Sequence, residues 1–145
     1  MILVDANLLI YAVNQDAVSH GRARDWLEEA LSGTVTLGLP WVSLLAFLRI
    51  TTHPGIFERP LHADDAAAFV DRWLDQPFVE PVGPGAHHWP ILRNLLGAVG
   101  TAGNLTSDAH VAAMAIERGA TVYSADHDFG RFPGVRHVNP LRDAT

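Results

Sequence analysis

Four aspartates of this chain stand where a small α/β domain could use them for catalysis. Asp5 follows the N-terminal apolar run, Asp108 lies in the first turn of a helical stretch, and Asp126 and Asp128 follow the apolar run 121–124. If the two runs are neighbouring strands of a parallel sheet, their carboxylates meet at one rim of that sheet. Crowded carboxylates repel one another unless a hard cation lies between them. The pattern therefore predicts a Mg²⁺ site, with Mn²⁺ as a substitute.

Each of these acids also has an ordinary structural explanation. Asp5, between a strand and a helix, could be an N-cap that accepts backbone N–H bonds. Asp108 could balance the helix dipole from the first turn. Asp126 and Asp128 could be turn residues that bond to their own backbone. Only the expected convergence of all four at one sheet edge favours the metal site, because capping alone does not require it.

The elements that must position these acids alternate between strand-length apolar runs and longer stretches of helical period. Strand and helix in this order predict an α/β fold, a three-layer sandwich around a mostly parallel sheet, as a single domain over residues 1–145. We expect strands at 1–5, 34–39, 78–82, 121–124 and 135–138, and helices directly after Asp5 and at 19–31, 41–52, 62–75, 84–97 and 105–118.

Some local features carry expectations of their own. Ser19 is a plausible N-cap for the second helix. A tight turn should follow the strand 121–124. The eight histidines include no pair at the i, i+4 spacing of a helical zinc site, and the adjacent His87 and His88 read as surface residues.

Composition limits the partners. With 145 residues and 48% hydrophobic content, the chain can build one real core. The net charge is -6 and all ten basic residues are Arg, so any contact with nucleic acid must be local, or helped by metal or a second subunit. Absent cysteine excludes disulfides and thiolate chemistry. Without a leader or an apolar stretch of about 20 residues, we expect a cytoplasmic protein that contacts no membrane.

Four short motifs together carry a resemblance to a known family. Through these motifs and their order along the chain, residues 1 to about 140 resemble the PIN-domain ribonucleases, most closely the toxin half of VapBC-type toxin–antitoxin pairs. The resemblance implies a metal-dependent endoribonuclease that hydrolyses RNA phosphodiester bonds. The motifs are Asp5-Ala6-Asn7, Phe47-Leu48-Arg49, Asp108-Ala109-His110-Val111-Ala112-Ala113 and Ser124-Ala125-Asp126-His127-Asp128-Phe129.

The resemblance also implies roles for individual residues. Asp5, Asp108 and Asp126 match the family's metal-binding and catalytic acids. Asp128 matches an acid that is sometimes added to them as a further ligand. The substrate contacts implied in the same way are Asn7, Arg49 and Ser124.

Two positions depart from the family pattern. The residue after Asp5 is Ala6, where the family often has Ser or Thr, and the larger departure is in the third helix. The family usually has a Glu three residues ahead of the helix Arg, and here that position is Ala46. We therefore expect one firmly held metal and a second brought by the substrate. The alternative is a PIN fold with little or no activity that serves as a binding or regulatory module. Two other classes fit less well, because a receiver domain needs a Lys, which the chain lacks, and a haloacid-dehalogenase-like phosphatase wants an Asp at Asn7.

Arg49 has two possible roles. It lies about one helical turn beyond Ala46, so it could take a phosphate oxygen or pair with one of the aspartates. The resemblance also implies a homodimer, an RNA substrate and a cognate small antitoxin. The antitoxin's C-terminal segment would lie over the acidic site, where a basic side chain excludes both metal and substrate.

Overall fold

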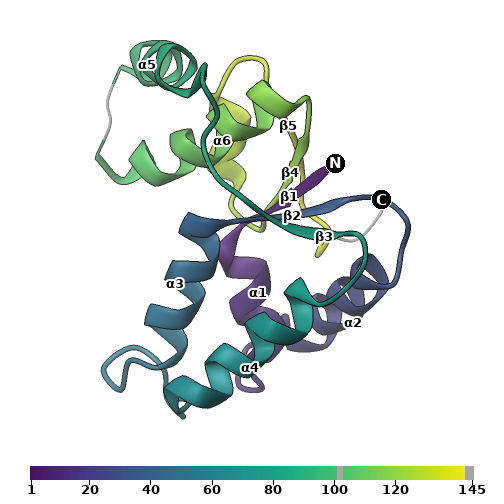
Figure 1. The fold of residues 1–145 in the computed structure, drawn as a ribbon. Helices are drawn as coiled ribbons and strands as arrows, with labels where there is room; N and C mark the ends of the chain where they lie inside the picture. Colours follow the sequence, from purple (N-terminus) through teal and green to yellow (C-terminus); the bar gives the residue numbers. More distant parts are fainter. Residues whose placement is uncertain (101–102, 143–145) are drawn as a thin grey trace.

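A five-stranded parallel sheet forms the middle layer of the computed structural model, which describes residues 1–100 and 103–142 (Figure 1). The strand order is β3-β2-β1-β4-β5, and every neighbouring pair is parallel. The predicted sheet is confirmed, including the adjacency of the first strand and the strand near 121–124. The strands are β1 (Ile2–Val4), β2 (Leu37–Pro40), β3 (Val79–Val82), β4 (Thr121–Tyr123) and β5 (Arg136–Val138).

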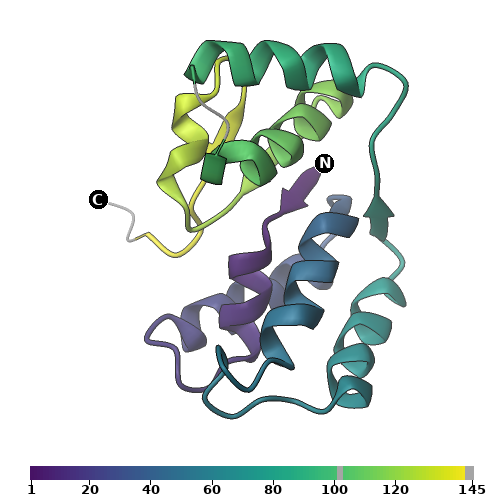
Figure 2. The ribbon, with the colours of Figure 1, turned by 90° about the vertical axis from the view of Figure 1, so that its left-hand side faces the viewer.

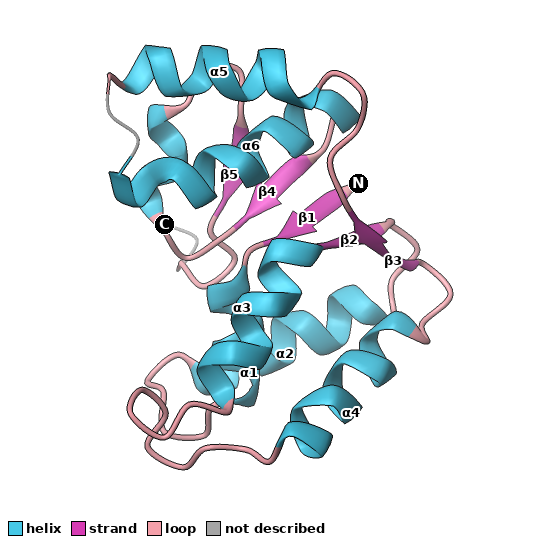
Figure 3. Cartoon of the chain, turned by 60° about the vertical axis from the view of Figure 1, so that its left-hand side comes forward, coloured by secondary structure: helices cyan, strands magenta, loops and turns pink. Residues whose placement is uncertain are grey.

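Helices cover both faces of the sheet, which confirms the three-layer prediction (Figures 2 and 3). One face carries α1 (Ala6–Val13), α2 (His20–Leu31), α3 (Trp41–Thr51) and α4 (Ala63–Leu74). The other face carries α5 (His88–Val99) and α6 (Thr106–Arg118). Two short 3-10 helices complete the described chain: η1 (Gly103–Leu105) and η2 (His127–Arg131). No helix in these described ranges is long and apolar enough to cross a membrane.

The central strand β1 is buried on both sides, which explains its uninterrupted apolar sequence. Successive side chains of a strand point to opposite faces. Leu3 packs into the core under α5 and α6, and Val4 packs into the core formed by α1 to α4. Neither side chain is exposed. Burial of such a side chain stabilises the fold by about 1.5–3 kcal/mol.

The sheet is tightest at Gly38, in the middle of β2. A Cβ atom at this position would lie 2.6 Å from Cδ2 of Leu3 and 2.9 Å from Cγ2 of Val82. Glycine lets the neighbouring side chains fill that space. A larger residue here would displace the side chains of Leu3 and Val82 from their core positions.

Two element starts differ from the sequence prediction. The fifth helix begins at His88 and not at 84, because the backbone before it is held by a side chain of another helix. The Glu117 carboxylate of α6 accepts the N–H groups of Gly85 and His87, both at 2.8 Å. The strand expected at 34–39 begins only at Leu37.

One local prediction was confirmed only in position, and another was wrong. Ser19 is the N-cap residue of α2, and its carbonyl accepts from the N–H of Ala23 at 2.9 Å. Its side chain makes no capping bond, because its φ of −86° and ψ of 6° are not the extended conformation that an N-cap usually adopts. The tight turn expected after β4 is instead the helix η2.

His88 is not the surface residue that the sequence suggested. It is half-buried, and its Nε2 lies 2.9 Å from Nδ1 of His110, so the two rings join α5 to α6. His87, in contrast, is exposed as expected. Burial, and secondarily the neighbouring His88, lowers the pKa of His110.

Candidate metal centre

The direction of chain travel across the sheet reverses at β1. The chain runs outward from β1 through β2 to β3, then returns to the other side of β1 as β4 and β5. In open α/β sheets, ligands bind at the carboxyl ends of the strands beside such a reversal. Asp5 follows β1 there, and its N–H donates to the carbonyl of Tyr123, the last residue of β4, at 3.0 Å. The two ends that carry Asp5 and Asp126 are thus adjacent.

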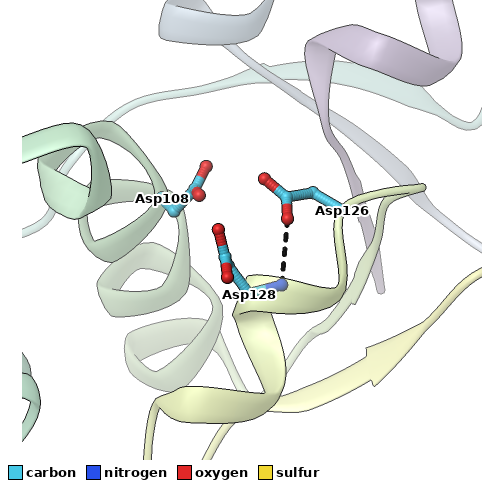
Figure 4. A group of neighbouring side chains, drawn as sticks. All are labelled: Asp108, Asp126 and Asp128. Carbon is cyan, nitrogen blue, oxygen red and sulfur yellow. Dashed lines mark hydrogen bonds between the residues drawn. The ribbon is translucent and has the colours of Figure 1, made fainter.

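Three carboxylates converge at this edge (Figure 4). One oxygen each of Asp108, Asp126 and Asp128 lies within 4.8 Å of the others. Asp108 comes from the first turn of α6, Asp126 caps η2, and Asp128 lies in the first turn of η2. All three are half-buried. Three of the four aspartates that were predicted to meet are therefore brought together.

Two of the acids have the capping role that was the structural explanation, and this role is compatible with metal binding. Asp5 is the N-cap of α1, and its Oδ1 accepts from the N–H of Ala6 at 2.9 Å. Asp126 is the cap of η2, and its Oδ1 accepts from the N–H of Asp128 at 2.9 Å. A carboxylate has two oxygens, so a cap can occupy one and leave the other for a ligand.

A buried network holds these acids in place from behind. The Ser124 hydroxyl donates to Oδ2 of Asp5 at 2.7 Å and accepts from the N–H of Asp126 at 2.9 Å. Nδ2 of Asn7 donates to the same hydroxyl at 3.1 Å, and Oδ1 of Asn7 accepts from the N–H of Ala125 at 3.2 Å. Asn7 and Ser124 are thus placed to orient Asp5 and Asp126. Their contact with substrate stays a prediction.

The pKa of Asp108 shows how strongly the acids interact. Burial, foremost, raises this pKa to about 7, and the charges of Asp5, Asp126 and Asp128 and a hydrogen bond with Asp126 add to the shift. A cation between these groups would remove the repulsion and favour the ionised form. The residues present therefore fit a divalent metal ion with oxygen ligands.

Asp5 lies at the edge of this group and not among the three closest oxygens. Burial is the largest cause that raises its pKa, and the hydrogen bonds from Ser124 and the backbone N–H of Ala6 oppose it. Asp5 contributes the largest charge effect on Asp108, so the four acids form one electrostatic unit. Its role as a direct metal ligand remains a prediction.

The opposite wall of the site comes from α3. A pocket of about 380 Å³ separates Asp5 and Asp108 from this helix, and Ala46 contributes only a methyl group to it. Arg49 lines the same pocket and is exposed. Within residues 1–100 and 103–142 no ion pair joins Arg49 to an aspartate. Its possible contact with a phosphate stays a prediction.

Two residues of the site were missed by reasoning from the sequence. Nε2 of His137 lies 3.0 Å from the carbonyl oxygen of Ser124, and its charge lowers the pKa of Asp5 after larger effects. The pairing of β4 with β5, which places His137 beside Val122, could have indicated it. Ser43 lines the pocket three residues before Ala46, at the spacing of one helix face.

The fold and this acidic rim define a class of protein. The PIN domain family matches residues 2–135. Among curated relatives, Ribonuclease VapC37 of Mycobacterium tuberculosis is 47% identical over 140 residues, which cover 97% of each chain. Ribonuclease VapC33 of the same species is 41% identical over 143 residues, which cover 99% of this chain and 100% of the relative.

Solved structures support the same fold. VapBC2 from Rickettsia felis, bound to a DNA fragment from its promoter, has a TM-score of 0.69 at 20% identity, over 96% of this chain and 98% of its own. VapC20 of Mycobacterium tuberculosis, a Sarcin-Ricin loop cleaving toxin, has a TM-score of 0.61 at 20% identity, over 94% and 99%. The chain belongs to the VapC family of PIN-domain ribonucleases, the toxins of toxin–antitoxin pairs.

Proposed function

We propose that this VapC-family toxin endoribonuclease uses Mg²⁺, or Mn²⁺ in its place, to hydrolyse phosphodiester bonds of RNA. The observation that carries the proposal is the convergence of Asp108, Asp126 and Asp128 at the sheet reversal, with the pKa of Asp108 raised to about 7. Oxygen-only ligands favour these two ions over softer metals. Asp5 joins them as the fourth acid, as ligand or as orienting group.

The bound ion supplies Lewis acidity, because it lowers the pKa of water and stabilises negative charge on a phosphate. The protein's own residues supply the rest. Asp108 must lose its proton before a cation can bind. Ser124 and Asn7 keep Asp5 and Asp126 oriented through the buried network. Arg49, across the pocket, can hold a phosphate oxygen of the substrate.

Two protein partners belong to this proposal. Solved relatives of the same fold are complexes named VapBC, so a cognate small antitoxin is the expected inhibitor. The four clustered acids would attract a basic side chain of the antitoxin, which would replace the metal and block RNA. A homodimer and a cytoplasmic location complete the proposal, with residues 1–145 as one domain. Expression of this chain alone should arrest growth, and co-expression of its cognate antitoxin should relieve the arrest.

The decisive experiment is cleavage of an end-labelled panel of transfer RNA, ribosomal RNA fragments and messenger RNA. Purified protein would be incubated with Mg²⁺ or Mn²⁺, with EDTA, and as the Asp5→Asn variant, in which Asn can still accept from Ala6. The exposed Asp64→Asn variant of α4 is the matched control. Cuts that need metal, vanish in Asp5→Asn and persist in Asp64→Asn support the nuclease. Folded, metal-binding protein without any cut would instead identify an inactive binding module.

A further inference from the structure

The pocket between α3 and α6 has the lining of a nucleotide site. Its walls include the apolar side chains of Val42, Leu45 and Val111, and Asp5 and Asp108 are among its lining residues. Arg49 supplies a positive charge to the same pocket. The volume of about 380 Å³ lies within the range of small-ligand sites. The pocket shares Asp108 with the cluster of three aspartates, so a nucleotide bound in it would lie beside a phosphate held at the acids.

Ser43 is the unusual member of this lining. It is 1% exposed, and its Oγ has no hydrogen-bond partner among the described residues. The two threonines at the opposite, C-terminal end of α3 donate back to the helix, Thr51 to the carbonyl of Phe47 at 2.8 Å and Thr52 to that of Leu48 at 2.7 Å. A buried polar group without a partner is rare in native proteins and calls for an explanation.

We propose that the Ser43 hydroxyl binds the ribose 2′-hydroxyl of the nucleotide next to the scissile phosphate. This inference rests on the proposed ribonuclease function and adds a residue that selects RNA over DNA. Because Oγ is buried as it stands, contact with a bound oxygen requires rotation about the one side-chain torsion of Ser43, which has three staggered positions. The 2′-hydroxyl is the group by which proteins distinguish RNA from DNA.

The chemistry of the pocket favours the ribose over a base edge. A base edge presents several polar groups, whereas the buried lining offers one hydroxyl without a partner among the described residues, that of Ser43, which matches the one hydroxyl at the ribose 2′ position. The apolar walls suit the carbon face of a sugar. Arg49 would hold a phosphate of the same strand, and Ala46 keeps the pocket open because its side chain ends at Cβ.

The test uses an RNA oligonucleotide that contains a cleavage site found with the panel above. A series of substrates would each carry a single 2′-deoxynucleotide, placed in turn at the positions flanking the cut. For the wild-type protein, one position should lower kcat/KM about 3- to 10-fold, the worth of one hydrogen bond. In Ser43→Ala that penalty should vanish, because the partner is gone. Ser107→Ala removes an exposed hydroxyl from the same pocket and should still show the full penalty of the 2′-deoxy substitution.

Thermal unfolding separates this role from a structural one. Since Ser43 Oγ has no partner in the part of the chain that the structure describes, Ser43→Ala should not lower Tm. A lower Tm together with an unchanged deoxy penalty would overturn the inference, as would a wild-type protein that tolerates every single deoxy substitution. Ala46→Leu, which fills the pocket, should raise KM and leave Mn²⁺ binding intact. A wild-type protein that cleaves no RNA would overturn the proposed function itself, and this inference with it.

Discussion

The two walls of the candidate metal site carry side chains of different chemistry. On the sheet side, carboxylates come from three separate segments, and hydrogen bonds with Ser124, Asn7 and backbone N–H groups fix Asp5 and Asp126. On the α3 side, Ala46 offers a methyl group, and Ser43 offers a hydroxyl that has no partner among the described residues. In the proposed function the first wall holds the cation and the second receives the substrate. The contrast predicts that metal binding and substrate binding can be altered independently.

The largest effect should follow the loss of charge on the sheet side. In Asp126→Asn the remaining oxygen can still accept from the N–H of Asp128, so η2 keeps its cap. The metal loses a charged ligand, and Lewis-acid stabilisation is worth several kcal/mol. Cleavage should therefore fall on the order of 100-fold or more, which corresponds to about 2.7 kcal/mol. End-labelled RNA assays measure this loss, and a variant as active as Asp64→Asn would show that the sheet wall holds no catalytic metal.

The network behind the acids should have the next largest effect. Ser124→Ala removes the donor to Asp5 and the acceptor for the N–H of Asp126, in a residue with no exposed surface. Loss of such supporting bonds typically lowers metal affinity or activity about 10- to 100-fold. Stability should also fall by about 1–3 kcal/mol, because buried polar groups lose their partner. Calorimetric titration with Mn²⁺ and thermal unfolding test both. Unchanged Mn²⁺ affinity would mean that the network only stabilises the fold.

A carboxylate added to the α3 wall should give both walls of the site a negatively charged group for the cation. Ala46→Glu places an acid in the pocket that Asp5 and Asp108 already line. Ligand charge tunes cation affinity, so Mn²⁺ should bind roughly tenfold more tightly. The longer side chain also occupies the substrate pocket, so KM for RNA should rise. Ala46→Gln, of the same size without the charge, is the control. Equal Mn²⁺ affinity in the two variants would show that position 46 does not reach the ion.

A smaller effect is expected from the charge on the α3 wall. Arg49→Gln removes a guanidinium that has no ion pair within the described residues, so folding should be unaffected. If Arg49 binds a phosphate, KM should rise several-fold and its dependence on salt should weaken, because one cationic contact is lost. Arg24→Gln, on α2, is the control. A salt dependence equal to that of wild type would exclude the phosphate contact.

Reasoning from the sequence recovered the sheet-side wall better than the α3 side. The end of a buried strand can be recognised in the sequence, because an apolar run of strand length stops at a polar residue such as aspartate. Asp5 and Asp126 could be placed together for that reason. Ser43 could not, because a serine inside an apolar helix gives no sign of whether its hydroxyl finds a partner. The start of α5 was misplaced for a similar reason, since Glu117 acts on residues 85 and 87 only through the tertiary fold.

The smallest expected effect is the pH dependence of stability that comes from Asp108 alone. The pKa of Asp108 rises from 3.8 to about 7 in the folded protein, chiefly through burial. Between these values the folded state binds more protons than the unfolded state. The stabilising contribution is therefore complete below pH 4 and is lost as the pH rises through 7. Since Asp108 is only half-buried, solvent screening keeps the effect small.

In EDTA, the Tm of the wild-type protein should thus fall relative to that of Asp108→Asn between pH 5 and pH 8. Asp5, whose pKa is also raised, is present in both proteins, so the difference between the two curves reports Asp108. Saturating Mn²⁺ should reverse the trend for the wild-type protein alone, because the cation binds only the ionised carboxylate and its affinity rises with pH. Parallel curves in EDTA would mean that Asp108 ionises at an ordinary pKa, and the repulsion that a metal ion is expected to relieve would then be absent.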